Sequence, residues 1–402
     1  MPVPQGGSIR VVGRRQGDGR ADHAVLGDAL AKPLAAPVLD EFLAGSDSPL
    51  VVVNDATRST PTEAMLGFVL PALQSCRNWR VIVATGLHRA PSEGELATIF
   101  GAHLDTVKER LLVHNGYDRD ALVTVDSPGG NVQINRAVRN ADRLILLNSV
   151  EPHFFAGYTG GRKSIIPGLA GHDTVQASHA GAMTTDSVPL RVAGNPVREF
   201  IRRATEPFVG DRCWAVQVVL DRDDRVAAAF AGNVDASFAA ATEAANRYYV
   251  VSLDQQFDIL VAAIHPPLDL NLYQAQKGWE LTQAGVRDGG VLILTSPCIE
   301  GVGSPFYQRL SEDFPKPEEW LTLATRPYTM GLHKLVRTAR VTSRIRVIAV
   351  TNMAPERVAR FGYDTAPTLA DAMHQAAAHV GASPNVLVVE DAALTTLTSR
   401  NT

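Results

Sequence analysis

Residues 50–73 read LVVVNDATRSTPTEAMLGFVLPAL and combine a strand, a turn and a helix in one short segment. Leu50–Asn54 is a β-branched apolar run, which is typical of a strand. The helical pattern of residues 62–73 follows Pro61, a residue that suits the first turn of a helix. The segment therefore predicts a βα unit, from which parallel sheets are built.

Compact apolar runs extend this pattern into two series of strands. The first series contains residues 50–54, 80–85, 144–148 and 214–220, and the second contains residues 257–264, 290–296, 345–351 and 385–390. Helical patterns lie between them at residues 92–99, 234–248, 318–325, 327–337 and 368–380. We predict an α/β protein with two domains, each with a largely parallel sheet flanked by helices, and an active site in the cleft between them.

The length of 402 residues also favours two domains, because one hydrophobic core rarely grows so large. We place an N-terminal domain at residues 1–252 and a C-terminal domain at residues 257–390. For the tail, from about residue 391 to 402, a return to the first domain stays open.

Composition excludes several classes of partner. The net charge is −4 and no long basic run occurs, so we expect no nucleic-acid partner. No segment reaches the roughly 18 apolar residues of a membrane span and no signal-peptide pattern opens the chain, so we expect no membrane partner and a cytoplasmic location. The three cysteines follow no metal-binding or redox spacing and are expected to be reduced thiols.

Polar clusters follow the first two predicted strands. Asp55, Thr57 and Arg58 occupy a strand-to-helix turn, where backbone N–H groups and a guanidinium can face a carboxylate or phosphate. A plain helix cap with an arginine in water is the alternative. His88 follows the second strand and is a candidate general base, whereas we interpret His114 as structural.

The segment EPHFFAGYTGGRKS, residues 151–164, is the most distinctive of the chain. Gly160 and Gly161 precede the pair Arg162 and Lys163, a pattern that indicates close approach of the backbone to an anionic ligand. It is not a P-loop, because Arg162 stands where that motif needs its last glycine.

Two further groups are candidates. His179 follows Lys163 by sixteen residues, and imidazole is a common ligand of nickel or zinc. One histidine is no metal site, so a cofactor would have to supply most of the coordination. Gln274 and Lys277 share one helical face and can point into an interdomain cleft, unless they simply begin an amphipathic helix.

Together these segments resemble the lactate racemase family, from Asp55 to about Gly301 and most specifically in residues 151–163 and 273–277. The resemblance implies a 2-hydroxy acid racemase or epimerase with a nickel-pincer nucleotide, which cofactor-maturation proteins supply. It implies the following roles: a covalent cofactor link at Lys163, a nickel ligand at His179, acid–base catalysis by His88 and His153, substrate contacts of Arg58, Tyr273, Gln274 and Lys277, and cofactor contacts of Asp55, Thr57, Gly160, Gly161 and Arg162.

The sequence departs from the family pattern near the implied substrate. Ser59 stands where the family turn commonly has proline, and Leu87 where a threonine often precedes the catalytic histidine. Neither change removes a functional group, so the reaction type is expected to hold. Lactate, a larger 2-hydroxy acid and a sugar acid inverted at C2 all stay open as substrates.

Hydride removal explains why such chemistry needs a cofactor. Taking a proton from C2 would place a carbanion beside a carboxylate, whereas taking a hydride leaves a neutral ketone. We hypothesise that His88 and His153 accept the hydroxyl proton of opposite enantiomers. The rivals are an NAD-dependent oxidoreductase, for which no convincing dinucleotide fingerprint is present, and a non-catalytic carrier of the nickel cofactor.

Overall fold

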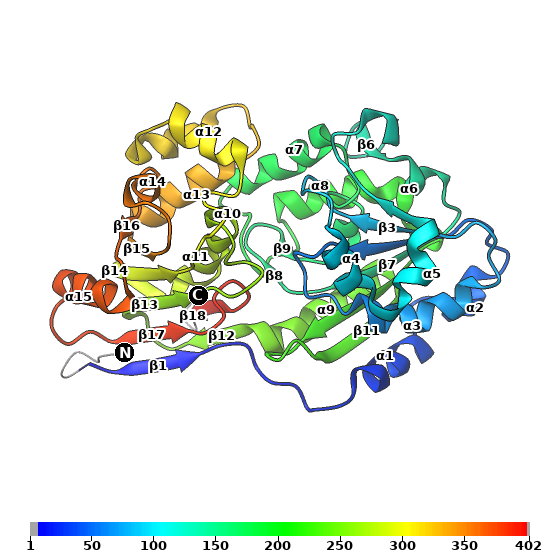
Figure 1. The fold of residues 1–402 in the computed structure, drawn as a ribbon, viewed down its shortest axis with the longest axis horizontal. Coiled ribbons are helices and arrows are strands. Elements are labelled where there is room, and N and C mark those ends of the chain that lie inside the picture. Colours follow the sequence, from blue (N-terminus) through cyan, green and yellow to red (C-terminus); the bar gives the residue numbers. More distant parts are fainter. Residues whose placement is uncertain (1–6, 400–402) are drawn as a thin grey trace.

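Two six-stranded sheets organise the chain, and the computed structural model describes residues 7–399 of it. Each sheet forms one lobe of the molecule (Figure 1). The strand order is β11-β10-β7-β2-β3-β4 in the first lobe and β1-β17-β13-β14-β15-β16 in the second. Only the β10–β11 pair is antiparallel in these sheets. The predicted class, α/β with two largely parallel sheets flanked by helices, is confirmed.

The first sheet separates two apolar cores, because alternate residues of its strands face opposite sides. Leu50 and Val52 pack into one core, whereas Val51 and Val53 pack into the other. The strands are β2 (Leu50–Asn54), β3 (Arg80–Ala84), β4 (Leu111–Val113), β7 (Leu144–Ser149), β10 (Cys213–Leu220) and β11 (Val226–Asn233). The helices are α1 (Asp22–Ala31), α2 (Leu39–Leu43), α3 (Thr62–Leu73), α4 (Glu93–Phe100), α5 (Leu104–Val107), α6 (Arg136–Asn140), α7 (His172–Ala180), α8 (Pro196–Thr205) and α9 (Val234–Tyr249).

The second lobe repeats this arrangement with a wholly parallel sheet. Its strands are β1 (Ile9–Val12), β13 (Phe257–Ala263), β14 (Val286–Thr295), β15 (Arg346–Val350), β16 (Asp364–Thr365) and β17 (Val386–Val389). Its helices are α10 (Leu272–Ala275), α11 (Lys277–Thr282), α12 (Pro305–Asp313), α13 (Leu332–Thr342), α14 (Pro355–Ala359) and α15 (Leu369–Val380). The helix predicted at residues 327–337 begins only at Leu332, because Gly331 adopts a left-handed conformation with φ of 95°. Residues 317–325 form a 3₁₀ helix rather than an α-helix.

Three two-stranded ladders complete the fold. They are β5 (Leu122–Val125) with β6 (Val132–Asn135), β8 (Pro152–His153) with β9 (Gly157–Tyr158), and β12 (Val250–Leu253) with β18 (Thr396–Ser399). The β8–β9 hairpin is the most relevant to function, because it lies inside the distinctive segment 151–164. The labels β8, β9 and α10 all stand at the junction of the two lobes in Figure 1.

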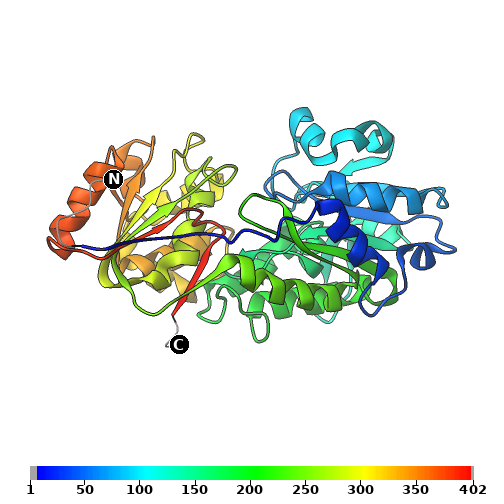
Figure 2. The ribbon, with the colours of Figure 1, turned by 90° about the horizontal axis from the view of Figure 1, so that it is seen from below.

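The N-terminal strand pairs outside the domain in which it was predicted, and the C-terminal tail pairs with residues 250–253 beside the predicted boundary. Residues 9–12, expected in the first domain, form β1 and pair in parallel with β17 of the second sheet. Figure 2 shows the N-terminal segment running from the second lobe across to the first. The C-terminal strand β18 pairs with β12, and Leu253 and Leu397 both join the core of the second lobe. Local sequence indicates a strand but does not name its partner.

The carboxyl ends of the strands set the position of the functional loops. β2, β3 and β7 run in parallel in adjacent positions, so the loops after Asn54, Ala84 and Ser149 leave the same edge of the first sheet. Those loops contain the candidate residues of the first lobe except His179, which lies in α7. No helix within residues 7–399 is long and apolar enough to cross a membrane.

Candidate functional site

His88 and Asp55 form a hydrogen-bonded pair at the edge of the first sheet. The Nδ1 atom of His88 lies 2.7 Å from Oδ2 of Asp55, and Oδ1 accepts hydrogen bonds from the backbone N–H and the hydroxyl of Thr57 at 3.1 and 2.6 Å. Burial opposes ionisation of Asp55, but the hydrogen bonds from His88 and Thr57 outweigh it and lower the pKa of Asp55. An ionised Asp55 keeps the imidazole proton on Nδ1 and leaves Nε2 as a proton acceptor.

Arg58 faces Glu151 across the site. Its Nη1 lies 2.5 Å from Oε1 of Glu151, whose side chain is 7% exposed. Glu151 occupies the predicted segment but was not among the predicted site residues. A glutamate two residues after a buried strand is the signal that could have identified it. The ion pair fixes one side of the guanidinium and leaves its other N–H groups for a carboxylate ligand.

His153 occupies the β8–β9 hairpin and is only 8% exposed. Its Nδ1 accepts hydrogen bonds from the backbone N–H groups of Ala156 at 3.2 Å and Phe155 at 3.5 Å. Neutral His153 therefore carries its proton on Nε2. Burial, helped by the positive charges of Lys163 and Arg58, lowers the pKa of His153 well below its usual value.

Lys163 lies in the 3₁₀ turn η4 (Gly161–Ser164). Protein groups surround its side chain, although part of it stays accessible to solvent. Within residues 7–399 no group accepts a hydrogen bond from its Nζ. Burial and the charges of Arg198, Arg58 and Lys277 lower the pKa of Lys163 well below that of an ordinary lysine. A lysine with a lowered pKa is in part a neutral amine, the form that attacks carbonyl-type groups.

His179 lies in the last turn of α7, and its ring centroid is 5.1 Å from that of Phe155. Lys163 Nζ lies 5.9 Å from the same Phe155 centroid, so the two residues share one neighbour. The Nδ1 atom of His179 bonds to the carbonyl oxygen of Val175 at 2.9 Å. A carbonyl only accepts, so Nδ1 holds the proton and Nε2 keeps a free lone pair, as in metal-ligating histidines. Burial, assisted by the Lys163 charge, lowers the pKa of His179 to about 4.

The second lobe contributes Tyr273, Gln274 and Lys277 at the junction of α10 and α11. Burial and the charges of Arg58 and Lys334 lower the pKa of Lys277 well below its usual value. The Oε1 atom of Gln274 is buried without a partner in the described part of the chain. Both side chains therefore offer polar atoms that the protein itself does not satisfy.

Three residues of α13 form a wall that the sequence analysis missed. The His333 ring makes an edge-to-face contact with Phe155. Lys334 Nζ lies 4.3 Å from the centroid of the Phe154 ring and donates a hydrogen bond to the carbonyl oxygen of Tyr273 at 3.0 Å. Arg337 donates to the carbonyl of Phe154 at 3.0 Å while it pairs with the buried Glu280 at 2.6 Å. The basic residues of α13 were the signal available in the sequence. The predicted helix began at residue 327 rather than 332, so the sequence did not show which helix face these residues occupy.

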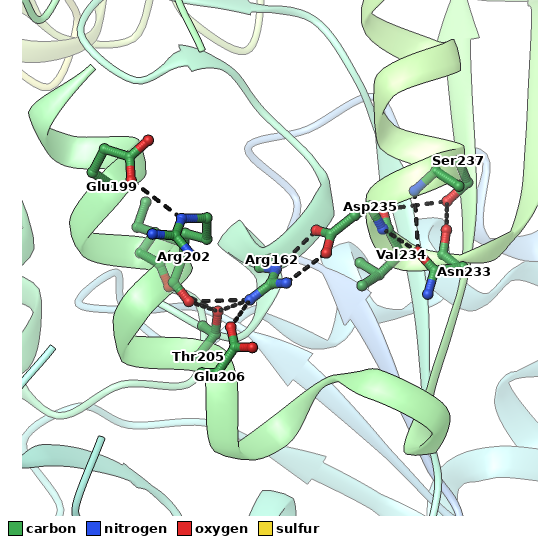
Figure 3. Close-up of polar contacts among 11 residues, drawn as sticks. Arg162, Glu199, Arg202, Thr205, Glu206, Asn233, Val234, Asp235 and Ser237 are labelled. Carbon is green, nitrogen blue, oxygen red and sulfur yellow. Dashed lines mark hydrogen bonds and ion pairs between the residues drawn. The ribbon is translucent and has the colours of Figure 1, made fainter. Parts of the chain in front are cut away.

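The structure does not bring Arg162 to the site. Its guanidinium pairs with Asp235 at 2.5 Å and with Glu206 at 3.0 Å, and so joins η4 to α9 and to the turn that follows α8, as Figure 3 shows. Gly160 and Gly161 also serve packing. A Cβ at Gly160 would meet Val150 at 2.6 Å, and one at Gly161 would meet Phe238 at 2.9 Å. These three predicted cofactor contacts therefore shape the loop that presents Lys163.

Basic groups dominate the assembled site. Burial and the charge of Arg58 lower the pKa values of both Lys163 and Lys277, and the nearby acids Glu151 and Asp55 are already engaged. No group of three or more His, Cys, Asp or Glu side chains within residues 7–399 could hold a metal ion. The free amine, the free imidazole nitrogen and the excess positive charge fit an anionic cofactor that binds a lysine covalently and brings most ligands of its own metal.

A cleft of about 400 Å³ adjoins these residues between the lobes. Thr57, Arg58 and Glu151 line it from the first lobe, and residues 265–268 and 390–391 line it from the second. The two groups of lining residues follow strands β2, β7, β13 and β17 at their carboxyl ends. This is the position at which α/β sheets bind their ligands.

Comparison with known proteins adds independent findings. The family model of the lactate racemase N-terminal domain matches residues 2–189, and that of the lactate racemase C-terminal domain matches residues 254–395. The chain is 29% identical over 377 residues to a lactate racemase of Lactiplantibacillus plantarum, which covers 90% of this chain and 88% of the relative. A lactate racemase of Thermoanaerobacterium thermosaccharolyticum is 28% identical over 308 residues, 74% of this chain and 71% of the relative.

Solved structures agree on the fold. The lactate racemase apoprotein from T. thermosaccharolyticum superposes with a TM-score of 0.88 at 24% identity, over 98% of this chain and 95% of that chain. A Thermotoga maritima protein superposes with a TM-score of 0.75 at 17% identity, over 96% of this chain and 100% of that one.

Proposed function

The chain belongs to the lactate racemase family, and from this premise we propose that it is a racemase or epimerase of 2-hydroxy acids whose nickel-pincer nucleotide is held by Lys163 and His179. Its relatives are named lactate racemases, and an isomerase activity follows from membership. Cofactor-maturation proteins are expected to supply the nucleotide.

The convergence of Lys163 and His179 carries the proposal. A lysine with a lowered pKa and an imidazole with a free Nε2 lie on opposite parts of one loop–helix segment, both within 6 Å of the Phe155 ring centroid. When bound, the cofactor supplies a reversible acceptor for the hydride of C2. The protein then has to bind the substrate carboxylate, move one proton and exclude water.

Arg58 is the proposed ligand of the substrate carboxylate. Its ion pair with Glu151 orients the guanidinium, and the remaining N–H groups can bind two carboxylate oxygens side by side. Lys277 of the second lobe is proposed to donate a further hydrogen bond to the carboxylate. Contacts from both lobes hold C2 in one place and keep water from the planar ketone.

His88 and His153 are the proposed acid–base groups. As the hydride leaves C2, the hydroxyl proton leaves as well, and the product is a 2-keto acid. His88 accepts this proton at Nε2, because the ionised Asp55 stabilises the imidazolium that forms. His153 presents an Nε2–H group and begins as a hydrogen-bond donor to the substrate oxygen. Return of hydride and proton to the opposite face gives the other configuration.

A panel of enantiopure 2-hydroxy acids tests the proposed function. Protein made together with the cofactor-building proteins is incubated with each acid, and the products are resolved by chiral chromatography. We expect inversion at C2 without net oxidation. Net formation of keto acid would contradict a racemase, and binding of cofactor without any inversion would favour a carrier.

Lys163→Ala tests the cofactor link separately. We expect the covalent adduct to disappear from the intact mass and inversion to be lost. Within the segment that contains His179, Lys163 is the described lysine that combines a lowered pKa with a free Nζ. Lys108→Ala, at an exposed lysine of the first lobe, is the matched control and should keep both. An active Lys163→Ala protein would refute the link.

A further inference from the structure

His153 receives its two backbone hydrogen bonds from consecutive peptide groups, and a side chain holds the carbonyl end of the first. The peptide between Phe154 and Phe155 donates through its N–H to Nδ1 of His153 at 3.5 Å. Its carbonyl oxygen accepts a hydrogen bond from Nη2 of Arg337 at 3.0 Å. A peptide group is planar and trans, so a side chain that fixes the direction of its C=O also fixes that of its N–H. Arg337 therefore orients the N–H group that faces His153.

Asn195 holds the second peptide group in the same way. The peptide between Phe155 and Ala156 donates to Nδ1 of His153 at 3.2 Å, and its carbonyl oxygen accepts from Nδ2 of Asn195 at 2.9 Å. Asn195 is fully buried at the N-terminus of α8, where its Oδ1 caps the helix by accepting from the backbone N–H groups of residues 197 and 198. The cap fixes which way the amide faces, so Nδ2 is directed at the hairpin.

Arg337 reaches the hairpin from the second lobe with a fully engaged guanidinium. Its Nε and Nη2 donate to the two carboxylate oxygens of the buried Glu280 at 2.6 Å each. Nη1 donates to the carbonyl oxygens of Ser187 at 2.9 Å and Ala182 at 3.4 Å, and the second hydrogen of Nη2 goes to Phe154. All five N–H groups of the guanidinium thus have acceptors, so its orientation is fixed.

The two peptide bonds determine which nitrogen of His153 carries the proton. Two N–H donors at Nδ1 oppose a proton there, so the proton of the neutral ring stays on Nε2. His88 begins in the opposite tautomer, because the Asp55 carboxylate, 2.7 Å from its Nδ1, keeps the proton on that nitrogen. One histidine therefore starts as a proton acceptor and the other as a hydrogen-bond donor, as inversion from a given enantiomer requires.

We propose that Arg337 and Asn195 are positioning residues of the reaction, which act through these two peptide groups to hold His153 as an Nε2–H donor. A donor at the carbonyl polarises the peptide and strengthens the hydrogen bond from its N–H. The inference rests on the proposed function, in which His153 is the second acid–base group. It adds that the second lobe, through Arg337, takes part in setting the state of a first-lobe histidine.

NMR of the imidazole nitrogens tests the tautomer independently of turnover. Full-length holoprotein is prepared with isotope-labelled histidine, and the His153 signals are assigned by their absence in His153→Gln. We expect an unprotonated Nδ1 and a protonated Nε2 in the wild type. A wild-type ring with its proton on Nδ1 would overturn the inference, whatever the inversion rate.

Asn195→Asp removes the amide donor and keeps the helix cap, because a carboxylate caps a helix as well as an amide does and suits a helix N-terminus. The new oxygen also faces the carbonyl oxygen of Phe155 and turns that peptide away. We expect the ratio of the Nδ1–H to the Nε2–H tautomer of His153 to rise about tenfold, the effect of losing one hydrogen bond.

Arg337→Met is combined with Glu280→Leu, so that no buried charge is left unpaired and the protein still folds. The tautomer ratio should rise less than in Asn195→Asp, about threefold, because the N–H that Arg337 orients lies 3.5 Å from Nδ1 rather than 3.2 Å. Arg340→Met is the matched control on the same helix. Arg340 donates to the carbonyl oxygens of residues 183 and 184 and to neither peptide at His153, so the ratio should stay unchanged.

Inversion kinetics of the same proteins show what the tautomer does. With the Lys163 adduct verified by intact mass, kcat should fall in the order of the tautomer shifts, whereas KM should stay close to that of the wild type because Arg58 is untouched. An unchanged tautomer ratio in both Asn195→Asp and the Arg337 double variant would overturn the inference. A shifted ratio with wild-type kcat would overturn the positioning role and the proposed role of His153. Adduct-carrying wild type that inverts no acid would instead overturn the proposed function.

Discussion

The two candidate acid–base histidines lie in opposite environments. The open side of the site consists of Asp55, Thr57 and His88, and the buried side of His153, Phe154, Phe155 and Lys334. The His88 side chain is 47% exposed and a carboxylate contacts its Nδ1. His153 is 8% exposed, and backbone N–H groups contact its Nδ1.

This difference shows that two histidines in one site need not be equally strong bases. A proton added to His88 is stabilised by Asp55, whereas a proton added to His153 must displace the Ala156 N–H and enter a positively charged neighbourhood. We therefore expect His88 to be the stronger proton acceptor. The two directions of racemisation must still balance, because enantiomers have equal free energies.

Removal of His88 is the largest test of the comparison. His88→Ala should lower the inversion rate about 10²–10⁴-fold, the usual contribution of a positioned acid–base group. The rate is measured by chiral chromatography from each pure enantiomer, with His374→Ala on the exposed face of α15 as control. A variant with the wild-type rate would remove His88 from the mechanism.

Glutamine at each histidine position tests the difference between donor and acceptor. A glutamine amide donates a hydrogen bond but does not take up a proton. His153→Gln should therefore keep at least about tenfold more activity than His88→Gln, since a positioned base contributes more than one hydrogen bond. Equal losses would mean that His153 also works as a base of comparable strength.

Asp55→Asn tests whether the Asp55 carboxylate makes His88 the stronger proton acceptor of the two histidines. The asparagine amide donates to Nδ1, which shifts the imidazole proton to Nε2 and removes the acceptor. We expect a loss of roughly 10²-fold, smaller than for His88→Ala, and no recovery at higher pH. In the wild type, the lowered pKa keeps the Asp55 carboxylate ionised at all pH values above the usual range of an aspartate. Full activity of the variant near pH 7 would contradict this role.

Much of the fold follows from local patterns. The strand at residues 50–54 and the helix at residues 62–73 form where the sequence predicts them, because burial and periodicity agree there. The partners of β1 and β18 were not readable, since an exposed strand such as Ile9–Val12 carries no mark of the strand beside it. Long-range pairing depends on the whole chain.

The candidate site was readable where residues cluster in sequence. The Asp55–Thr57 turn and the Lys163–His179 spacing gave residues that the structure places close together or against a shared neighbour. Arg162 shows the limit, because a basic residue beside a functional lysine has the same appearance whether it binds a ligand or Asp235. The buried α13 residues could not be predicted as site residues, because they reach the site only where the second lobe packs against the first.

Replacement of Lys334 gives the smallest expected effect, a change in how thermal stability depends on pH. It tests whether the buried side of the site disfavours positive charge. Burial lowers its pKa from 10.5 to about 7, so between these values the unfolded chain binds a proton that the folded protein does not. Stability therefore rises with pH from about 7 to 10.5 and is insensitive to this group below that window. Lys334→Met should flatten the rise in Tm between these limits.

Thermal unfolding at several pH values measures this effect. Lys108→Met, at an exposed lysine, is the control and should keep the wild-type slope. A slope that is the same in Lys334→Met and the wild type would show that Lys334 stays charged in the folded protein, and the buried side would then tolerate a proton on His153 more readily than proposed.

The central claim is that Lys163 carries the cofactor through which C2 is inverted. Peptide mass mapping of active protein tests it most directly, because trypsin does not cleave after a modified lysine. The account predicts a peptide spanning residues 163–191 with the mass of the nucleotide on Lys163, in proportion to nickel content and to inversion rate. Cleavage after an unmodified Lys163 in protein that still inverts its substrate would contradict the account.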